Sequence, residues 1–140
     1  MAVSFKIFGK VNFTPYTKVS KFAQDLRENK LEGTKCKKCG QIYFPPRADC
    51  NKCMSSDMEW RSYSGKGKLV TFTTIHAAPT GFDDMAPYTI GVVDLQEGGR
   101  LLAWVEGIKP EELKIGMELR AVPTILEEVE ELKVVYVLRK

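Results

Sequence analysis

The sequence contains two Cys-x-x-Cys pairs with only ten residues between them, formed by Cys36, Cys39, Cys50 and Cys53. The chain has no other cysteine. A Cys-x-x-Cys turn delivers two sulfurs to one ion, and two such turns complete the tetrahedral shell that Zn²⁺ prefers. We therefore expect one structural zinc site held by two knuckles. Iron is the alternative metal, because the spacing also resembles that of rubredoxin-like ribbons.

This metal site is expected to be structural because four cysteines fill the coordination shell, whereas a catalytic zinc keeps one position open. A ribbon this short buries little apolar surface, so metal binding should supply most of its folding free energy. Gly40, directly after the first pair, can take the positive φ of a tight turn. Met54 occupies the equivalent place after the second pair. That knuckle must therefore have a different shape or carry modest strain.

The composition is that of an ordinary globular protein, with 44% hydrophobic and 28% charged residues. No apolar run approaches the roughly 18 residues of a membrane span. The first residues lack the apolar core of a secretory signal, because Lys6 and Lys10 interrupt it. We expect a cytoplasmic protein, since a reducing compartment favours metal-bound cysteines over disulfides.

Charge is unevenly distributed along the chain. Residues 1–70 contain fourteen Lys/Arg and six Asp/Glu, a net charge of +8, while residues 71–140 contain seven and twelve, a net charge of −5. The basic half favours an anionic partner, although lysines would also offset the negative charge of a zinc tetrathiolate. The basic residues nearest the cysteines are the candidate ligand-binding residues: Lys37, Lys38, Arg47 and Lys52.

The segment before the cysteines has the spacing of an amphipathic helix. Its apolar residues recur at i, i+3, i+4 and i+7: Val19, Phe22, Ala23 and Leu26. This pattern predicts a helix from about Thr17 to Lys30, capped by Thr17 or Ser20, with Gly33 just beyond its end where the chain reverses. The helix is too short to fold alone, so its apolar face must dock on the rest of the protein or on a partner.

After Trp60 the sequence becomes rich in β-prone runs. We expect strands at about 69–76, 88–95 and 100–106, a helical turn at 109–113, and strands at about 118–125 and 133–139. The second and third strands should form a hairpin across Gly98 and Gly99. This order predicts a five-stranded OB-fold barrel, because an SH3-like barrel would lack the helix between strands three and four. The predicted protein is mainly β, with an N-terminal helical segment (1–33), a rubredoxin-like zinc ribbon (34–59) and an OB-fold barrel (60–140).

The loop at 77–87 is the candidate partner-binding segment. Loops this long are often functional, and Phe82 and Met85 would be exposed apolar groups unless they pack on the barrel. The single histidine, His76, has no nucleophile and acid nearby that form a recognisable catalytic set. Asp83 and Asp84 are adjacent, and successive side chains usually diverge. We therefore expect no catalytic residues.

Several motifs together resemble a known family. They are Cys-Lys-Lys-Cys-Gly at 36–40, Tyr-Phe-Pro-Pro-Arg at 43–47, the second cysteine pair, Trp60, Ser-Gly-Lys-Gly at 64–67 and Lys-Ile-Gly-Met at 114–117. From about Val19 onward the chain is similar to the zinc-ribbon and OB-fold family known as domain of unknown function 35, which is associated with acyl-CoA enzymes. Many members end in a Pro-x-Phe-x-Pro-like tail, which residues 134–140 do not match.

The resemblance implies a non-catalytic accessory subunit. Such a subunit associates with thiolase-superfamily enzymes, including archaeal acetoacetyl-CoA thiolase and hydroxymethylglutaryl-CoA synthase, and helps to hold coenzyme A between them. The implied partners are thus a thiolase-superfamily enzyme and acyl-CoA, with no membrane.

Single-stranded nucleic-acid binding is the competing hypothesis, since OB barrels commonly stack bases on aromatic side chains within a positive groove. The candidate stacking residues are Phe72, Tyr88 and Trp104. Against this, residues 71–140 carry a net charge of −5, and acidic residues fall on or beside the strands that would face the nucleic acid: Asp94, Glu97 and Glu106. A protein scaffold without any ligand is a third alternative.

Overall fold

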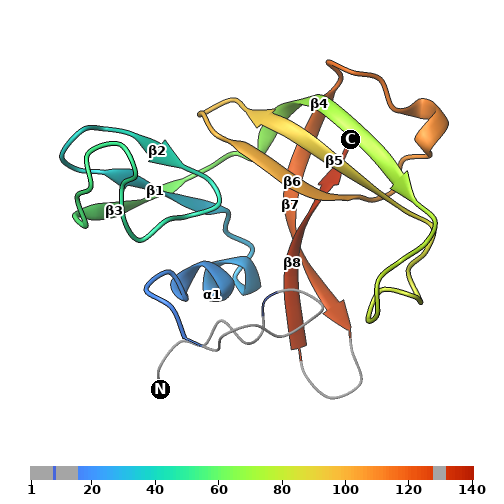
Figure 1. The fold of residues 1–140 in the computed structure, drawn as a ribbon, viewed down its shortest axis with the longest axis horizontal. Coiled ribbons are helices and arrows are strands. Elements are labelled where there is room, and N and C mark those ends of the chain that lie inside the picture. The colour runs from blue at the N-terminus through green and yellow to red at the C-terminus, as the bar shows by residue number, and fades with distance from the viewer. Residues whose placement is uncertain (1–7, 9–15, 128–131) are drawn as a thin grey trace.

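The computed structural model describes residue 8 and residues 16–127 and 132–140. The described residues form a small ribbon sheet, a short helix and a closed barrel (Figure 1). The helix is α1 (Lys21–Arg27), and the ribbon consists of β1 (Glu32–Cys36), β2 (Ile42–Tyr43) and β3 (Met58–Ser62). The barrel consists of β4 (Lys66–Ile75), β5 (Tyr88–Leu95), β6 (Arg100–Val105), β7 (Glu118–Glu127) and β8 (Leu132–Arg139). The predicted fold class is confirmed.

The barrel has the strand order of an OB fold. Its order is β4-β5-β6-β8-β7, closed by pairing of β4 with β7 and of β6 in parallel with β8. The 3₁₀ turn η2 (Pro110–Glu112) lies between β6 and β7, where the sequence predicted a helical turn. β5 and β6 form the predicted hairpin, and Gly98 and Gly99 take φ values of 112° and 93° in its turn. Only glycine adopts such angles without strain.

The ribbon sheet has the order β2-β1-β3. It runs from Glu32 to Ser62, so Trp60 pairs with Thr34 inside the ribbon sheet, beyond the expected limit at residue 59. Gly33 lies within β1, and a Cβ there would overlap the carbonyl oxygen of Tyr43. The expectation that Gly33 ends the helix is therefore wrong. Glycine is needed there because β1 and β2 approach too closely for a side chain.

The helix α1 is shorter than the predicted range 17–30. The Ser20 hydroxyl donates to the carbonyl of Thr17 at 2.8 Å and accepts from the Thr17 N–H at 2.9 Å, so this side chain closes a preceding turn and does not cap the helix. At the other end Asn29 takes a φ of 62° and reverses the chain. Asparagine tolerates this left-handed conformation because its short polar side chain can bond locally. Turn-forming residues at both ends thus shorten the helix to seven residues.

An aromatic cluster joins the helix, the ribbon and the barrel into one core. Phe44 of the ribbon lies 5.8 Å from Phe22 of α1 and 5.6 Å from Tyr136 of β8, measured between ring centroids. Tyr63, which follows β3, lies 5.1 Å from Phe44. Phe22, Phe44 and Tyr63 are buried. The prediction that the helix docks on the rest of the protein is confirmed.

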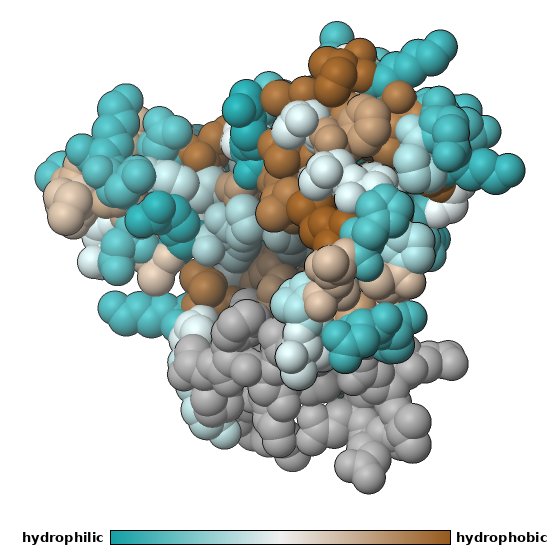
Figure 2. All heavy atoms as spheres, turned by 45° about the vertical axis from the view of Figure 1, so that its right-hand side comes forward, coloured by the Kyte–Doolittle hydropathy of each residue, from teal (hydrophilic) through white to brown (hydrophobic). Residues whose placement is uncertain are grey.

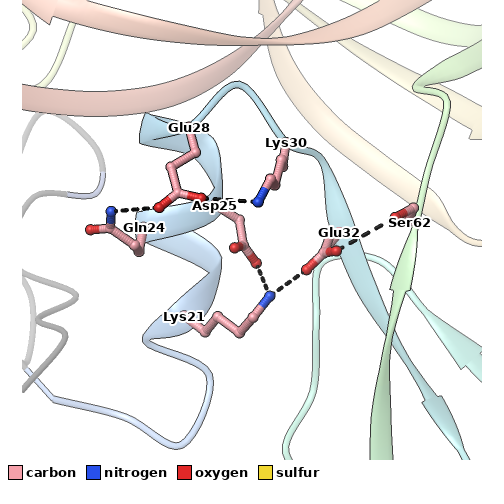
Figure 3. Close-up of polar contacts among 7 residues, drawn as sticks. All are labelled: Lys21, Gln24, Asp25, Glu28, Lys30, Glu32 and Ser62. Atoms are coloured by element: carbon pink, nitrogen blue, oxygen red, sulfur yellow. Dashed lines mark hydrogen bonds and ion pairs between the residues drawn. The ribbon is translucent and has the colours of Figure 1, made fainter.

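A charged network also ties α1 to the ribbon (Figure 3). The Lys21 ammonium bridges the carboxylates of Asp25, at 2.6 Å, and Glu32, at 2.5 Å, and lies 4.8 Å from the centre of the Trp60 ring. The Lys21 hydrogen bond lowers the pKa of Glu32. Burial raises the pKa of Asp25, because removal from water disfavours its charged form. Lys21 is therefore the cation that compensates two carboxylates at this junction.

Candidate metal centre and partner surface

The four cysteine sulfurs meet at one point between the knuckles. They all lie within 4.8 Å of one another, and the Cys36–Cys53 and Cys39–Cys50 sulfur pairs are each 3.5 Å apart. Four sulfurs about 2.3 Å from a tetrahedral ion would be about 3.8 Å apart. The cysteines are therefore positioned to bind one metal ion, and Cys36 and Cys50 are buried whereas Cys39 is exposed.

The two knuckles share the same backbone geometry. In the first, the Gly40 N–H donates to the Cys36 carbonyl at 2.9 Å; in the second, the Met54 N–H donates to the Cys50 carbonyl at 3.1 Å. Gly40 has a φ of 78° and Met54 a φ of 63°. Of the two alternatives for the second knuckle, modest strain is correct and a different shape is wrong. A side chain is tolerated there because Met54 is 80% exposed.

Electrostatics at the cluster favour a bound cation. The backbone N–H of Cys39 lowers the pKa of the Cys36 thiol. At Cys53 the backbone N–H of Ser55 lowers the thiol pKa, but burial and the neighbouring cysteines outweigh it and raise the pKa to about 11. Four thiolates this close repel one another unless a positive ion lies among them. The site thus fits a divalent metal.

Tyr43 is a member of this site that the sequence did not single out. Its single hydroxyl proton has two acceptors in reach, the Asn51 side-chain oxygen at 2.6 Å and the Cys50 sulfur at 3.2 Å, and its oxygen accepts from the Asn51 N–H at 3.2 Å. Donation from this hydroxyl to the sulfur is the largest of the causes that lower the pKa of Cys50 to about 6, and the backbone N–H groups of Cys53 and Lys52 add to it. Groups that bond to metal ligands orient and tune them. The sequence contained one signal for this role, a tyrosine between the two cysteine pairs whose hydroxyl group can form a hydrogen bond with a cysteine sulfur.

The candidate ligand-binding residues Lys37, Lys38, Arg47 and Lys52 are all exposed on the ribbon. Lys37 lies 3.7 Å from the Asp57 carboxylate, and the Arg47 guanidinium lies 5.5 Å from the centre of the Tyr43 ring. Two hollows on the described part of the chain are lined by other side chains.

The outer face of β5 and β6 carries apolar side chains in cross-strand pairs. Ile90 pairs with Trp104, and Val92 pairs with Leu102, which is 55% exposed. We call these four residues the apolar barrel face. Ile90, Leu102 and Trp104 also border a shallow hollow of about 190 Å³. Figure 2 shows hydrophobic side chains reaching the surface of the barrel, whereas mainly hydrophilic ones cover the ribbon.

The loop after β4 folds back onto this face. The Phe82 ring lies 6.1 Å from that of Trp104 and 6.4 Å from that of Tyr88, between centroids. Phe82 and Met85 are each half-buried, so the loop extends the apolar barrel face and is not detached from it. Phe82 therefore partly covers the rings of Trp104 and Tyr88, on which nucleic-acid bases would have to stack. His76 is exposed just beyond β4 and makes no hydrogen bond among the described residues.

Comparison with known proteins identifies both parts of the chain. Residues 23–59 match the model described as the ChsH2 rubredoxin-like zinc ribbon domain, and residues 60–123 match that of the ChsH2 C-terminal OB-fold domain. A DUF35 domain-containing scaffold protein of Pyrococcus furiosus is 39% identical over 81% of this chain and 83% of its own length. The chain belongs to the DUF35 family. The resemblance seen in the sequence is confirmed.

Other DUF35 relatives extend this comparison. The scaffold protein of Methanocaldococcus jannaschii is 43% identical over 66% of each chain. The benzoylsuccinyl-CoA thiolase subunit BbsA of Thauera aromatica is 37% identical over 59% of this chain and 56% of its own. The solved structure of the Ltp2-ChsH2(DUF35) aldolase superposes with a TM-score of 0.73 at 27% identity, over 89% of this chain and 95% of that one. No helix in the described part of this DUF35 chain has the length and apolarity needed to cross a membrane.

Proposed function

We propose that this chain is a non-catalytic accessory subunit that binds a thiolase-superfamily acyl-CoA enzyme. The partner docks on the apolar barrel face and on the adjoining loop residues Phe82 and Met85. A zinc ion at the four cysteines stabilises the folded ribbon, which the Phe44 contacts attach to the helix and barrel. Two Cys-x-x-Cys pairs retained as metal ligands suit a reducing compartment, so we assign the complex to the cytoplasm.

The observation that carries this proposal is the chemistry of the barrel face. Binding in OB folds uses the outer face of the second and third strands, here β5 and β6. In this chain that face presents Ile90, Val92, Leu102 and Trp104, and the one basic side chain that β5 and β6 add to it, Arg100, is paired with Asp94. An exposed apolar patch of this kind is typical of a protein–protein interface. Relatives named as a thiolase subunit and as scaffold proteins support the choice of partner.

Acyl-CoA is the small molecule that this complex would handle. One candidate location for its anionic groups is the set of exposed basic side chains on the ribbon, Lys37, Lys38, Arg47 and Lys52, because lysine and arginine are the usual partners of phosphate. Among the described residues only Lys37 of these four forms an ion pair, with Asp57. The charges of the other three are thus available to a ligand.

The test is complex formation with the thiolase-superfamily enzyme of the same organism. The two proteins are co-expressed, treated with nuclease and separated by size-exclusion chromatography. We expect a stable complex whose elution is unchanged by the nuclease. Absence of a complex, together with salt-sensitive binding of a single-stranded oligonucleotide by the chain alone, would instead favour the nucleic-acid hypothesis.

A matched pair of variants tests the docking face. Leu102→Glu places a charge at the centre of the apolar barrel face, and Ile115→Glu places the same charge at another exposed apolar residue, which is 65% exposed. Both side chains are exposed, so both variants should fold. We expect Leu102→Glu to weaken the complex at least tenfold and Ile115→Glu to leave it unchanged. Equal binding by the two variants would rule out this face.

A further inference from the structure

A second hollow, of about 820 Å³, lies on the outside of the barrel where β4 begins, β5 ends and β7 begins. Its charged lining consists of four basic and two acidic side chains: Lys66, Lys68, Arg120, Lys140, Asp94 and Glu118. Between them, Leu95 and Leu119 are buried in the barrel and form the floor. The volume is within the range of about 300–1,000 Å³ that is usual for small-molecule sites.

The strand register places like charges opposite one another in this hollow. Lys66 of β4 is the direct cross-strand partner of Arg120 of β7, while Lys68 lies opposite both Glu118 and Asp94. Like charges directly opposite on neighbouring strands destabilise a sheet unless something compensates them. A bound anion between Lys66 and Arg120 would supply that compensation.

The hollow keeps a net positive charge although two acidic side chains line it. Asp94 is held by Arg100 from outside the hollow, through bonds of 2.5 and 3.1 Å to both of its carboxylate oxygens. This bidentate pair lowers the pKa of Asp94 and satisfies its charge. Among the side chains that line the hollow, Glu118 is then the single carboxylate left to face the four cations. Within the described part of the chain, none of those four side chains forms an ion pair with a carboxylate.

The spacing of these cations indicates the chemical class of the ligand. Side chains two residues apart on one strand are separated by about 7 Å, and directly opposed ones by about 5 Å. Two linked phosphates can occupy this span with each phosphate in contact with at least one of the three cations, Lys66, Lys68 and Arg120. We propose that this hollow binds the diphosphate group of a small phosphorylated molecule, with Lys66, Lys68 and Arg120 as its principal ligands.

This hollow adjoins the apolar barrel face on the same sheet. The Asp94–Arg100 cross-strand pair is followed, two residues along each strand, by the Val92–Leu102 pair of that face. A molecule held by its diphosphate would therefore lie beside any protein docked there. This position relative to an enzyme rests on the proposed function, but diphosphate binding by the chain alone does not.

The experiment uses the metal-loaded chain without any enzyme, so its result is independent of complex formation. Pyrophosphate, ADP, coenzyme A and adenosine are titrated by calorimetry at low ionic strength, where exposed charges are least screened. We expect saturable binding of the three diphosphate-containing probes and none of adenosine. Similar affinity for all three would identify a general diphosphate site; tighter binding of coenzyme A would identify that carrier as its ligand. Absence of saturable binding by all three would overturn the proposal.

Variants locate the site. Lys66→Gln/Arg120→Gln should weaken diphosphate binding at least tenfold. Lys109→Gln/Lys114→Gln removes the same charge from exposed positions elsewhere on the barrel and should have little effect. Lys37→Gln/Lys38→Gln tests the ribbon as the alternative location. Loss of binding in the ribbon variant with retention in the Lys66/Arg120 variant would overturn the assignment, as would equal losses in all three.

Discussion

The ring of Phe44, from the Phe-Pro-Pro-Arg segment of the ribbon, packs edge-on against the ring of Phe22 in α1, with centroids 5.8 Å apart. Phe44 is 4% exposed and also contacts Tyr63 and Tyr136. It therefore connects three parts of the chain that are separated in sequence. The cysteines shape the ribbon, but this aromatic contact attaches the ribbon to the helix and barrel.

Phe44→Ala should destabilise the protein by about 3–5 kcal/mol, because it removes a buried ring and leaves a cavity at this junction. The free energy of unfolding is measured by urea denaturation of the metal-loaded protein. Leu102→Ala, at an exposed apolar position, is the control and should change stability by roughly 0.5 kcal/mol or less. A loss below about 1 kcal/mol for Phe44→Ala would show that the ribbon is held in another way.

Removal of the metal should unfold the ribbon and leave the barrel. We expect one zinc ion per chain by elemental analysis of the purified protein, and none bound tightly by Cys36→Ser. Since the ribbon sheet has few buried side chains of its own, its amides at 32–62 should lose protection from hydrogen exchange when a chelator is added. Amides of β5 and β6 should keep theirs. Purified protein that is fully folded without stoichiometric metal would contradict the structural role of the site.

Tyr43→Phe should weaken zinc binding about tenfold at pH 6, as expected for loss of a hydrogen bond to a metal ligand. The hydrogen bond from this hydroxyl is the largest cause of the lowered Cys50 pKa, about 6, so its removal raises that pKa and lets protons compete with the metal for this sulfur above pH 6. The penalty should be complete near pH 6 and fade as the pH approaches 9. Competition with a chromophoric chelator at several pH values measures it.

Tyr16→Phe is the control for that measurement, because Tyr16 is exposed and lies outside the metal site. It should bind zinc as the unmodified chain does at every pH. A Tyr43→Phe penalty that stayed constant with pH would mean that the hydroxyl acts on the fold of the ribbon and not on the Cys50 thiolate.

Lys21→Met should destabilise the protein by about 1–3 kcal/mol at pH 7, because the buried Asp25 carboxylate loses its cation. This loss of stability is smaller than that expected for a fully buried ion pair, because Lys21 is about half exposed and water screens its charge. The folded-state pKa of Asp25 is already raised by burial and should rise further in the variant. Protonation then relieves the unpaired charge, so the loss should be smaller at pH 5 than at pH 7.

Urea denaturation at the two pH values measures this difference. Lys30→Met is the control, since Lys30 pairs with the exposed Glu28 and should contribute little at either pH. If Lys21→Met and Lys30→Met behaved alike, the charged network in Figure 3 would have no special part in docking α1.

Local sequence patterns predicted much of the architecture. The four cysteines and their spacing predicted a single cluster, because a Cys-x-x-Cys turn fixes the positions of two sulfurs almost by itself. Strand periodicity and the Gly98-Gly99 turn likewise predicted the β5–β6 hairpin, since both signals act over a few residues. The helix ends were predicted less well: Asn29, and not Gly33, takes the left-handed conformation.

The sequence by itself determined the metal cluster, the mainly β fold and the family, because these depend on contacts between residues close in the chain or on motifs read directly. Only the tertiary structure showed why Gly33 must be glycine, that Tyr43 reaches the sulfur of Cys50, and that Lys66 faces Arg120. Each of these relationships depends on strand register, which pairs residues distant in sequence. A composition or a motif does not specify which residues lie opposite one another.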